Sequence, residues 1–405
     1  MTRVCTLPCA ICRALLRLFR MSTDNKFDLI ILGGGCAGLS LAQRLSQAGQ
    51  QCPKVLIIEG RSCYQNDRTW CFFAGGTTQA QDLVRYRWPA VAVTHGQVRV
   101  EVACQNNPYQ MIEAETFYTK ALEQLAENQK VTLTLGCEVL TLERQATLAW
   151  CVNTRLGVFE APSVIDTRPV ANPIFLGPQL WQSFYGQVVQ VEQDCFDPTC
   201  VEFMRFDPDT EYGVSFTYLL PFNKRQALIE TTVFCSKPVD QVTLTARLQS
   251  VIGRVLPGQS VSLKRHEYAV LPMGVIDGAR SEFNGLVRVG LTAGAARPSS
   301  GYAFQRIQHW ATLCAQSILV GGPVLAHAKE PWLARSMDSL FLRVLRQHPE
   351  QGPTIFMAMF KNMQIARIVR FMNDEATWLD RFLLIKSMPL WVFLTQVPFA
   401  LLRRP

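Results

Sequence analysis

The order of apolar and polar residues near the start of the chain predicts a strand, a glycine turn, a helix and a second strand. Residues 29–32 are a short run of leucine and isoleucine, typical of a strand covered on both faces. Apolar positions in residues 39–48 recur at helical spacing and end before Gly49, a suitable C-cap. Residues 55–58 form a second apolar run. This order predicts the first unit of a doubly wound α/β domain.

The turn between this strand and helix carries glycines in G-x-G-x-x-G register. Gly33 suits the tight turn, Gly35 lets the backbone approach a pyrophosphate, and Gly38 lets the helix pack closely on the strand. The phosphate would bind at the free N–H groups of the helix start. Glu59 stands 21 residues beyond Gly38, where an acid binds the ribose hydroxyls. An ordinary glycine turn is the alternative, but the strand, helix and acid together predict a dinucleotide site. The full set of candidate residues here is Gly33, Gly34, Gly35, Cys36, Ala37, Gly38 and Glu59.

The position of this unit bears on which dinucleotide it binds. It lies near the start of the chain and is not repeated, which favours tightly held FAD over exchangeable NAD. The pattern further predicts helices at 79–88 and 116–129, strands within 91–102, and strands at 131–135 and 164–167 that return to the same sheet.

The middle third of the chain changes character. Strand-like segments rich in phenylalanine and tyrosine follow one another from residue 184 to residue 233, which predicts an antiparallel sheet inserted in the nucleotide fold. Each aromatic residue alone suits a protein core, but together they suit a long apolar substrate or a stabilised cation. The candidate substrate residues are Trp70, Tyr185, Phe216, Tyr218 and Phe222.

Two acids are candidates for proton transfer. Glu230 lies inside an apolar, β-branched strand, and if it faces a dry cavity, burial raises its pKa and makes it a proton donor near neutral pH. An outward-facing glutamate is the alternative. Glu267 is the second candidate, although Arg265 would also suit it as a plain ion-pair partner.

A second cofactor segment is expected between residues 289 and 304. A strand runs into small residues, then into a Pro-Ser-Ser-Gly turn and a helix at 302–319, whose first N–H groups would face a flavin ring. The candidates are Gly294, Pro298, Ser299, Ser300, Gly301 and Tyr302.

Length and composition change this picture little. The 405 residues, 48% hydrophobic, suit two or three domains. The net charge of +8 includes four arginines before any acid, so it does not indicate nucleic acid. The 14 cysteines are scattered, which favours reduced thiols in a cytoplasmic protein and no metal site.

The two chain ends call for separate expectations. Residues 1–20 make a poor signal peptide, and Met21 is favoured as the natural start over a segment that lies on a membrane surface. The expected domains are a 1–26 extension, an FAD-binding domain at 27–170 and 276–330, a substrate-binding β domain at 171–275, and a helical C-terminal region at 331–405. Residues 387–402 are apolar and end on arginines, but prolines interrupt them. They are too short to span a bilayer, which takes about 20 residues, so surface docking is expected.

The motifs, taken in order, resemble those of the lycopene β-cyclase family of bacterial and plant type. The resemblance rests on the glycine motif, Thr69-Trp70, residues 218–222, Glu230 with Thr232, residues 271–274 and residues 297–302, and it covers about residues 27–398. It implies a fold like that of flavoprotein hydroxylases, bound FAD that is active when reduced, and NAD(P)H as the external reductant. It further implies carotenoid biosynthesis: closure of β-ionone rings on the ψ end groups of lycopene or a related linear carotenoid, at the cytoplasmic face of a membrane. Glu230 matches the family's essential acid.

Four positions depart from the family pattern. Thr231 stands where many members have a second acid, Arg205 follows Met204 in place of an aspartate, and Phe73 and Arg297 replace histidines. These changes leave Glu230 with less acidic help. The alternative function is that of a flavin monooxygenase or polyprenyl reductase on the same fold. A Gly-Asp pair that is usual in monooxygenases is Gly290-Leu291 here, which argues against the first of these.

Overall fold

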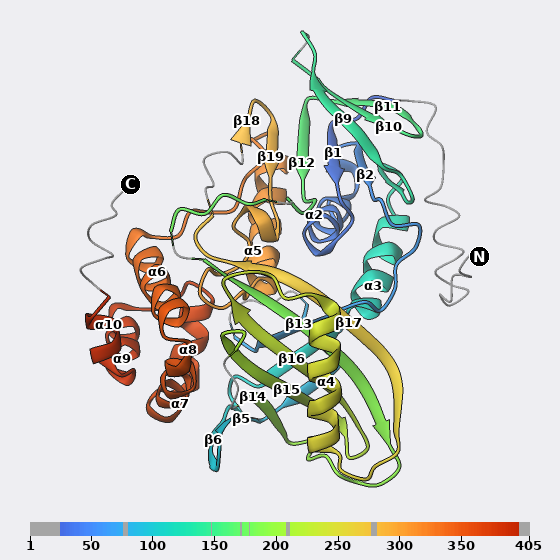
Figure 1. Cartoon of the computed structure of the whole chain (residues 1–405). Helices are drawn as coiled ribbons and strands as arrows, with labels where there is room; N and C mark the ends of the chain where they lie inside the picture. The colour runs from blue at the N-terminus through green and yellow to red at the C-terminus, as the bar shows by residue number, and fades with distance from the viewer. Residues whose placement is uncertain are drawn as a thin grey trace.

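The computed structural model describes residues 25–75, 80–146, 148–170, 172–177, 179–207, 211–276 and 282–396. The expectations for residues 1–24 and for the last residues of the apolar C-terminal segment, 397–405, lie outside the described residues. Within them, two main sheets are joined by helices and followed by a helical C-terminal region (Figure 1).

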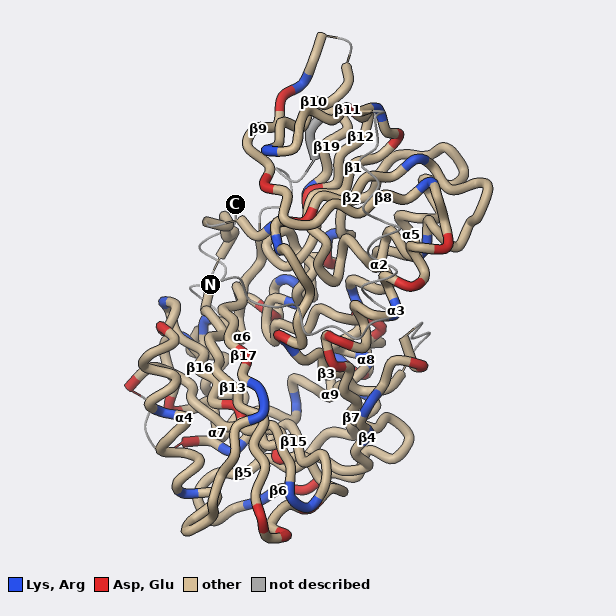
Figure 2. The backbone as a smooth tube through the Cα atoms, turned by 90° about the vertical axis from the view of Figure 1, so that its right-hand side faces the viewer, with Lys and Arg blue, Asp and Glu red and all other residues tan. Residues whose placement is uncertain are grey.

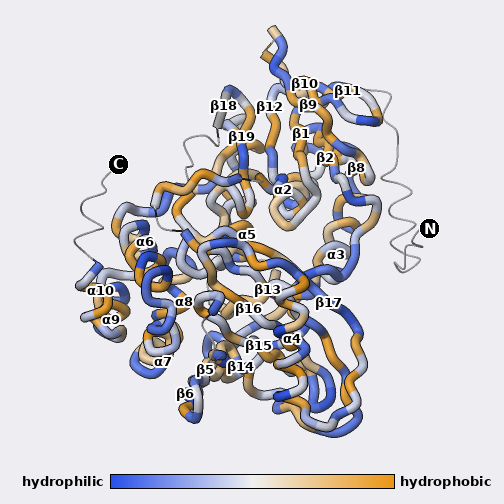
Figure 3. Tube along the Cα trace, in the orientation of Figure 1, coloured by the Kyte–Doolittle hydropathy of each residue, from blue (hydrophilic) through white to orange (hydrophobic). Residues whose placement is uncertain are grey.

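The first sheet is the predicted nucleotide-binding sheet. Its strand order is β18-β19-β12-β1-β2-β8, parallel except for β18. The strands are β1 (Leu29–Leu32), β2 (Val55–Ile58), β8 (Val131–Thr134), β12 (Ser163–Asp166), β18 (Glu282–Phe283) and β19 (Leu286–Arg288). β1 and β2 are buried along their whole length, as their unbroken apolar runs predict, and orange predominates along them in Figure 3.

Three helices pack with this sheet. They are α2 (Cys36–Ser46), α3 (Ala114–Ala126) and α5 (Phe304–Leu319). Side chains of all three share one hydrophobic core with β1 and β2. The helix predicted at 79–88 is wrong where it is described, because residues Gln81–Leu83 form a single 3₁₀ turn and Tyr86–Trp88 form strand β4. Tyr86 and Trp88 alternate with Arg87, and this period of two is that of a strand.

The second sheet has seven strands in the order β17-β13-β16-β15-β14-β5-β6. They are β5 (Ala90–His95), β6 (Val98–Ala103), β13 (Leu180–Val191), β14 (Cys200–Phe206), β15 (Val214–Asn223), β16 (Gln226–Cys235) and β17 (Val261–Met273). It is the predicted antiparallel sheet, but β14 and β5 pair in parallel. The expected domain boundaries do not follow the sheets here, since β5 and β6 belong to the 27–170 segment of the sequence.

The two faces of this second sheet have different neighbours. Helix α4 (Gln241–Val255) packs on β13 and β16 on one face. The other face meets the C-terminal helices, which are α6 (Trp332–Gln347), α7 (Gly352–Asn362), α8 (Ile365–Met372), α9 (Trp378–Ser387) and α10 (Leu390–Leu394). Tertiary packing therefore separates a structural face from a face available to a ligand.

Two small sheets complete the fold. One joins β3 (Thr69–Phe73), β7 (Tyr109–Glu113) and β4 (Tyr86–Trp88), and the other joins β9 (Val139–Arg144), β10 (Trp150–Thr154) and β11 (Gly157–Ala161). Lys and Arg positions are interspersed with Asp and Glu along the chain (Figure 2). No described helix is long and apolar enough to cross a membrane.

Candidate active site

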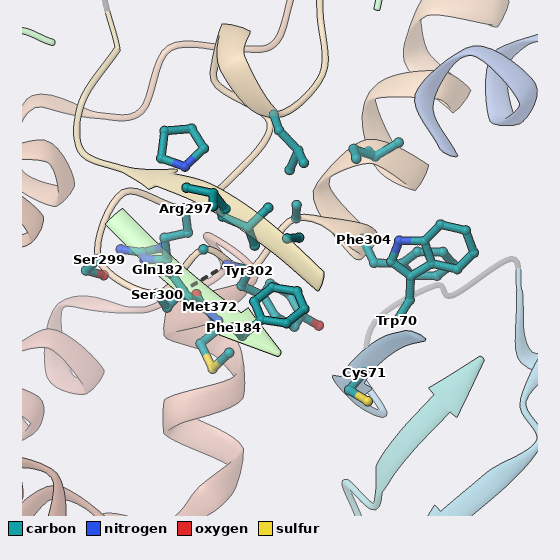
Figure 4. Close-up of a pocket in the computed structure, with 18 of the residues that line it drawn as sticks. Trp70, Cys71, Gln182, Phe184, Arg297, Ser299, Ser300, Tyr302, Phe304 and Met372 are labelled. Atoms are coloured by element: carbon teal, nitrogen blue, oxygen red, sulfur yellow. Dashed lines mark hydrogen bonds between the residues drawn. The ribbon is translucent and has the colours of Figure 1, made fainter. Parts of the chain in front are cut away.

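One cavity of about 1130 Å³ connects the glycine turn with the second sheet and the C-terminal helices. It is larger than the range of about 300–1,000 Å³ that is usual for a single small-molecule site. Figure 4 shows part of its lining, with Trp70 and Phe304 at one side and Gln182, Ser299 and Tyr302 at the other. The cavity therefore brings together most of the segments that the sequence singles out.

The glycine turn forms one end of the cavity. Gly33 and Gly35 line it, together with Cys36 and Ala37 at the start of α2. A Cβ atom added at Gly35 would meet no atom within 4 Å, so the backbone is open to an approaching ligand. The N-cap of α2 has no side-chain partner, which leaves its first N–H groups available for an anion.

The other two glycines of this turn act through packing. Gly34 and Gly38 do not line the cavity. A Cβ at Gly38 would collide with the carbonyl oxygen of Gly33, so glycine is needed for the close approach of helix and strand. Gly33 has a φ of +98°, which favours glycine, and makes the tight turn.

Glu59 lies at the end of β2, beneath the glycine turn, and lines the cavity. Its Oε2 accepts a hydrogen bond from the Gly34 N–H at 2.6 Å, and its Oε1 accepts one from the Arg61 N–H at 2.8 Å. Burial opposes ionisation, but the hydrogen bonds and charge of Arg61 hold the pKa of Glu59 below its ordinary value. Glu59 is therefore an ionised acceptor that also fixes the glycine turn.

The second cofactor segment lies across the cavity from β3. Ser299, Ser300, Gly301 and Tyr302 line the cavity, whereas Gly294 and Pro298 do not. A Cβ at Gly294 would nonetheless meet no atom within 4 Å. Four of the six residues predicted for this segment thus face the same space as the glycine turn.

Arg297 secures this segment to the C-terminal region. It is buried, and its Nη1 donates to the backbone oxygen of Phe371 and to Asp374 Oδ1, the latter at 2.7 Å. Its Nη2 donates to Asp338 Oδ1 at 3.3 Å. Arg297 thus forms the link between the Pro-Ser-Ser-Gly turn and helix α6.

The two candidate acids line the cavity from strands β16 and β17 of the second sheet, one on each side of β13. β13 runs between β16 and β17, and Gly186 stands opposite Glu230 on one side and Glu267 on the other. Both glutamates are buried and line the cavity. Thr232 Oγ1 donates to Glu230 Oε1 at 2.9 Å.

The electrostatics of the two acids differ. Burial, then the charge of Glu267 and a hydrogen bond with it, raise the pKa of Glu230 well above its ordinary value. Glu267 Oε2 accepts hydrogen bonds from Arg265 Nη1 and Thr69 Oγ1, both at 2.8 Å. Arg265 thus pairs with Glu267, as the alternative reading of the sequence had it. The arrangement places Glu230, a carboxyl with a raised pKa, beside Glu267, which is paired with Arg265.

Two of the five predicted substrate residues line the cavity. Tyr218 is directly opposite Glu230 in the ladder of β15 and β16, and Trp70 packs against Phe117 and Phe304 at the cavity wall. Burial and the charge of Glu230 raise the pKa of the Tyr218 phenol, which keeps it neutral.

The other three lie outside the lining, for separate reasons. Tyr185 points to the opposite face of β13, where it packs in the core under α4. Phe216 is fully buried against Phe206 and Phe234, and Phe222 stacks on Tyr86. Strand alternation excludes Tyr185, and packing beneath the lining excludes Phe216.

Sequence reasoning missed much of the apolar lining. It comes from β13, β14 and the C-terminal helices, and includes Phe184, Met204, Met337, Phe341, Phe356, Met359, Phe360, Phe371, Met372 and Phe393. The high content of phenylalanine and methionine in residues 337–372 was the available signal. These positions are typical of a helical core, so periodicity alone does not distinguish them.

Comparison with known proteins identifies the family. The model of the family described as "Lycopene cyclase protein" matches residues 28–396. The chain belongs to the lycopene cyclase family. It is 26% identical over 382 residues to lycopene beta-cyclase of Pseudescherichia vulneris, covering 89% of this chain and 94% of that protein. It is 24% identical over 341 residues to the chloroplastic lycopene beta cyclase of Arabidopsis thaliana, covering 76% of this chain and 64% of that protein. These matches confirm the resemblance found in the sequence.

Solved structures show the same fold at low identity. A geranylgeranyl bacteriochlorophyll reductase-like protein from Thermoplasma acidophilum aligns with a TM-score of 0.63 at 11% identity, over 92% of this chain and 99% of that one. The p-nitrophenol 4-monooxygenase of Pseudomonas putida aligns with a TM-score of 0.56 at 14% identity, over 93% of this chain and 98% of that one. The predicted fold class is confirmed. The tomato relative, a chloroplastic neoxanthin synthase of Solanum lycopersicum, is 23% identical over 319 residues, 74% of this chain, and the match spans only 62% of its own length.

The structure shows what surrounds the residues that depart from the pattern of the lycopene cyclase family. Thr231 is paired with Tyr185 across β16 and β13, so both side chains face away from the cavity. Arg205 pairs with Glu202 at 3.2 Å outside the cavity. Phe73 packs against Tyr109 and Phe203.

Proposed function

We propose that this protein is a lycopene β-cyclase that closes β-ionone rings on the ψ end groups of lycopene, giving γ-carotene and β-carotene. One observation carries the proposal: a buried carboxyl with a raised pKa, Glu230, faces an aromatic cavity in a member of the lycopene cyclase family. Such an acid retains its proton near neutral pH and can deliver it to a carbon–carbon double bond.

The chain's residues fit FAD as the cofactor. Gly35 leaves open space at the start of α2, Glu59 offers an ionised acceptor for ribose hydroxyls, and Ser299–Tyr302 line the opposite side of the same cavity. When bound in its reduced form, the electron-rich flavin would supply electrostatic stabilisation of positive charge. NAD(P)H is the proposed external reductant.

The reaction needs a proton, a shielded cation and a base. Glu230 gives its proton to the terminal C1–C2 double bond of the end group, which leaves a tertiary cation. The C5–C6 double bond attacks this cation, and the C6 proton is lost to leave the ring. Glu267, which is paired with Arg265, stabilises the developing positive charge and is the candidate acceptor for the C6 proton.

The rest of the cavity protects this cation. The aromatic faces of Tyr218 and Phe203 line the same space as Glu230. The phenylalanine and methionine side chains from the C-terminal helices exclude water, which would otherwise quench the cation as an alcohol. Substrate and product are isomers, so the proposed reaction consumes no reducing equivalents.

Expression in cells that accumulate lycopene tests this proposal. The wild-type gene should convert lycopene to cyclic carotenes, identified by chromatography, and Glu230→Gln should lose most of this conversion at unchanged protein level and flavin content. The matched control is Glu202→Gln, a glutamate of similar burial on β14 that lies outside the cavity. Unchanged lycopene with the wild-type gene would contradict the function, and near-normal conversion by the Glu230 variant would move the donor role elsewhere.

A flavin monooxygenase or polyprenyl reductase remains the second candidate, because solved structures of both kinds share the fold. Anaerobic turnover with chemically reduced FAD separates the two. The cyclase should form many rings per flavin while the reduced spectrum persists. One flavin oxidised per product, or a requirement for oxygen, would overturn the cyclase and leave the fold intact.

We further propose that the protein docks on the surface of a membrane through α9 and α10. Trp378, Phe382 and Trp391 on these helices are 74%, 61% and 62% exposed. Ile385, Leu390 and Leu394 are also exposed and at the same time line the cavity. Exposed apolar side chains at a cavity wall suit a substrate that dissolves in the bilayer, because the substrate would reach Glu230 without crossing water.

Vesicle co-sedimentation tests this docking. Replacing both Phe382 and Trp391 by serine should lower the bound fraction on phospholipid vesicles. Leu140→Ser, which removes an exposed leucine from β9 in the nucleotide-binding half, is the matched control and should leave binding unchanged. Equal binding of the double variant and the control would refute docking through α9 and α10.

A further inference from the structure

Gly186 occupies the place where the two buried acids meet. It is the residue of β13 paired with Glu230 of β16 and, on its other edge, with Glu267 of β17. Residues directly opposite one another in neighbouring strands project to the same face of a sheet. The two glutamates therefore stand two strand spacings apart, about 10 Å between their Cα atoms, with only a hydrogen atom on the residue between them.

The absence of a side chain at residue 186 leaves room for the acids to lean toward each other. A Cβ atom added there would lie 3.1 Å from Leu228 Cδ1, 3.2 Å from Glu230 Cβ and 3.3 Å from Glu230 Cγ. The backbone conformation of Gly186 does not demand glycine, because its φ is not among the positive values. The closeness of the Leu228 and Glu230 side chains, and not a turn, is the reason for glycine at this position.

Glu267 is held by two further residues. Arg265 Nη1 and Thr69 Oγ1 both donate to its Oε2 at 2.8 Å, and Arg265 Nη2 donates to Thr69 Oγ1 at 2.8 Å. The three side chains form a closed triangle that joins β3 to β17. Arg265 and Glu267 are only 12% and 4% exposed, so their ion pair is little screened by solvent.

We infer that Gly186, Arg265 and Thr69 are positioning residues that hold Glu267, in its ion pair with Arg265, against Glu230, so that the single proton of the acid pair resides on Glu230. The catalytic meaning of this arrangement rests on the function proposed above, but the arrangement itself does not. Because two like charges in contact are unfavourable in a buried site, one of the two acids must be neutral. The ion pair with Arg265 selects which one.

The other groups around Glu230 agree with this assignment. Tyr218 on β15, Cys71 on β3 and Tyr109 on β7 interact electrostatically with Glu230, and burial raises the pKa of each of them. All three are therefore neutral near pH 7. Among the described groups that act on Glu230, the charged ones are Glu267 and Arg265.

Infrared difference spectroscopy over pH tests the inference without any substrate. A protonated carboxyl has a C=O stretch that is absent from a carboxylate. The wild-type protein, carrying its cofactor, should retain a band of this kind from Glu230 well above pH about 4.3, the ordinary value for glutamate. The difference between wild type and Glu230→Gln isolates this band from that of Asp338, another buried carboxyl with a raised pKa. Glu267→Gln should shift the midpoint of the Glu230 band downward by about one pH unit or more, a tenfold change in proton affinity, since a like charge is removed.

The positioning residues have their own variants. In Glu230→Gln, adding Arg265→Gln should make a protonated band of Glu267 appear, because the buried carboxylate loses its cation. Adding Thr69→Val instead removes one hydrogen bond and keeps the cation, so it should have a smaller effect in the same direction. Gly186→Ala should lower the midpoint of Glu230, since the added Cβ separates the two acids. Glu202→Gln on β14 is the control and should change neither band.

The outcomes separate the inference from the proposed function. A Glu230 band that titrates at the same pH with and without Glu267 would overturn the inference, as would a Glu267 that stays ionised after loss of Arg265. Should Gly186→Ala fail to fold, the Glu267 and Arg265 variants decide the question alone. Wild-type protein that forms no cyclic carotene yet shows the paired titration would overturn the function and uphold the inference.

Discussion

The raised pKa of Glu230 predicts that this acid destabilises the folded protein at neutral pH. An unfolded glutamate loses its proton near pH 4.3, whereas the folded one retains it to higher pH. Between these two values the folded state binds more protons than the unfolded state, so stability falls as pH rises. The limiting slope for one proton is about 1.4 kcal/mol per pH unit.

Replacing Glu230 by glutamine removes this dependence, because the amide stays neutral and resembles the protonated acid in shape. The variant should therefore gain stability relative to wild type as pH rises above the ordinary range of glutamate, at a slope of at most about 1.4 kcal/mol per pH unit. Other ionisable groups contribute to both proteins and cancel in the difference. Below pH 4 the two proteins should differ least.

Urea unfolding of both proteins, each with its cofactor content matched, measures this difference at pH 5, 6 and 7. Glu202→Gln provides the comparison for removing a buried glutamate whose partners are Thr94 and Arg205. A difference between wild type and Glu230→Gln that is constant over this range would refute the reasoning, since it would mean that Glu230 titrates alike in the folded and unfolded states.

Three further substitutions test other parts of the fold. Gly35→Val should abolish flavin binding, measured by the flavin spectrum of the purified protein, because the side chain would enter the open space beside α2. Gly253→Val on α4 is the control. A normal flavin spectrum in the Gly35 variant would refute the site. Asp380→Asn should destabilise the protein by about 2–3 kcal/mol at pH 7, because Asp380 is buried and accepts hydrogen bonds from Arg367 and Arg370. Since the pKa of Asp380 is lowered in the folded state, this loss should shrink as pH falls through the ordinary range of aspartate. Equal urea midpoints at pH 7 would contradict this. Arg297→Met should cost on the order of 3–5 kcal/mol in urea unfolding, since Asp338 would be left buried without its cation; an unchanged midpoint would show that Arg297 adds nothing to stability.

The sequence was sufficient for the nucleotide-binding end of the site because its signals are local. A buried strand, three glycines and an acid at a fixed distance all lie within residues 29–59, and the structure places Gly33, Gly35 and Glu59 around one cavity. Local chemistry dictates each position, so no long-range contact is needed to recognise it. The same holds for the Pro-Ser-Ser-Gly turn at residues 298–301.

The substrate end depends on pairing between distant strands, and here the pattern was insufficient. Tyr185 and Phe184 are both aromatic neighbours in the sequence, yet only Phe184 faces the cavity, because successive residues of β13 point to opposite faces. Which face lines the cavity follows from where α4 packs. The aromatic and methionine side chains of α6, α7 and α8 likewise resemble core residues until the sheet beneath them is known.

Strand pairing also explains how Glu230 has a second carboxyl nearby although the residue next to it, Thr231, is not an acid. The family often has a second acid beside the essential one, and this chain has Thr231 there. A side chain at residue 231 faces the α4 side of β16, away from the cavity, so an acid at this position would not act directly on Glu230. The second carboxyl comes instead from Glu267, two strands away and in register with Glu230 across Gly186. Neighbours in the sequence are thus less informative about this acid than neighbours in the sheet, which place a second carboxyl in register with Glu230.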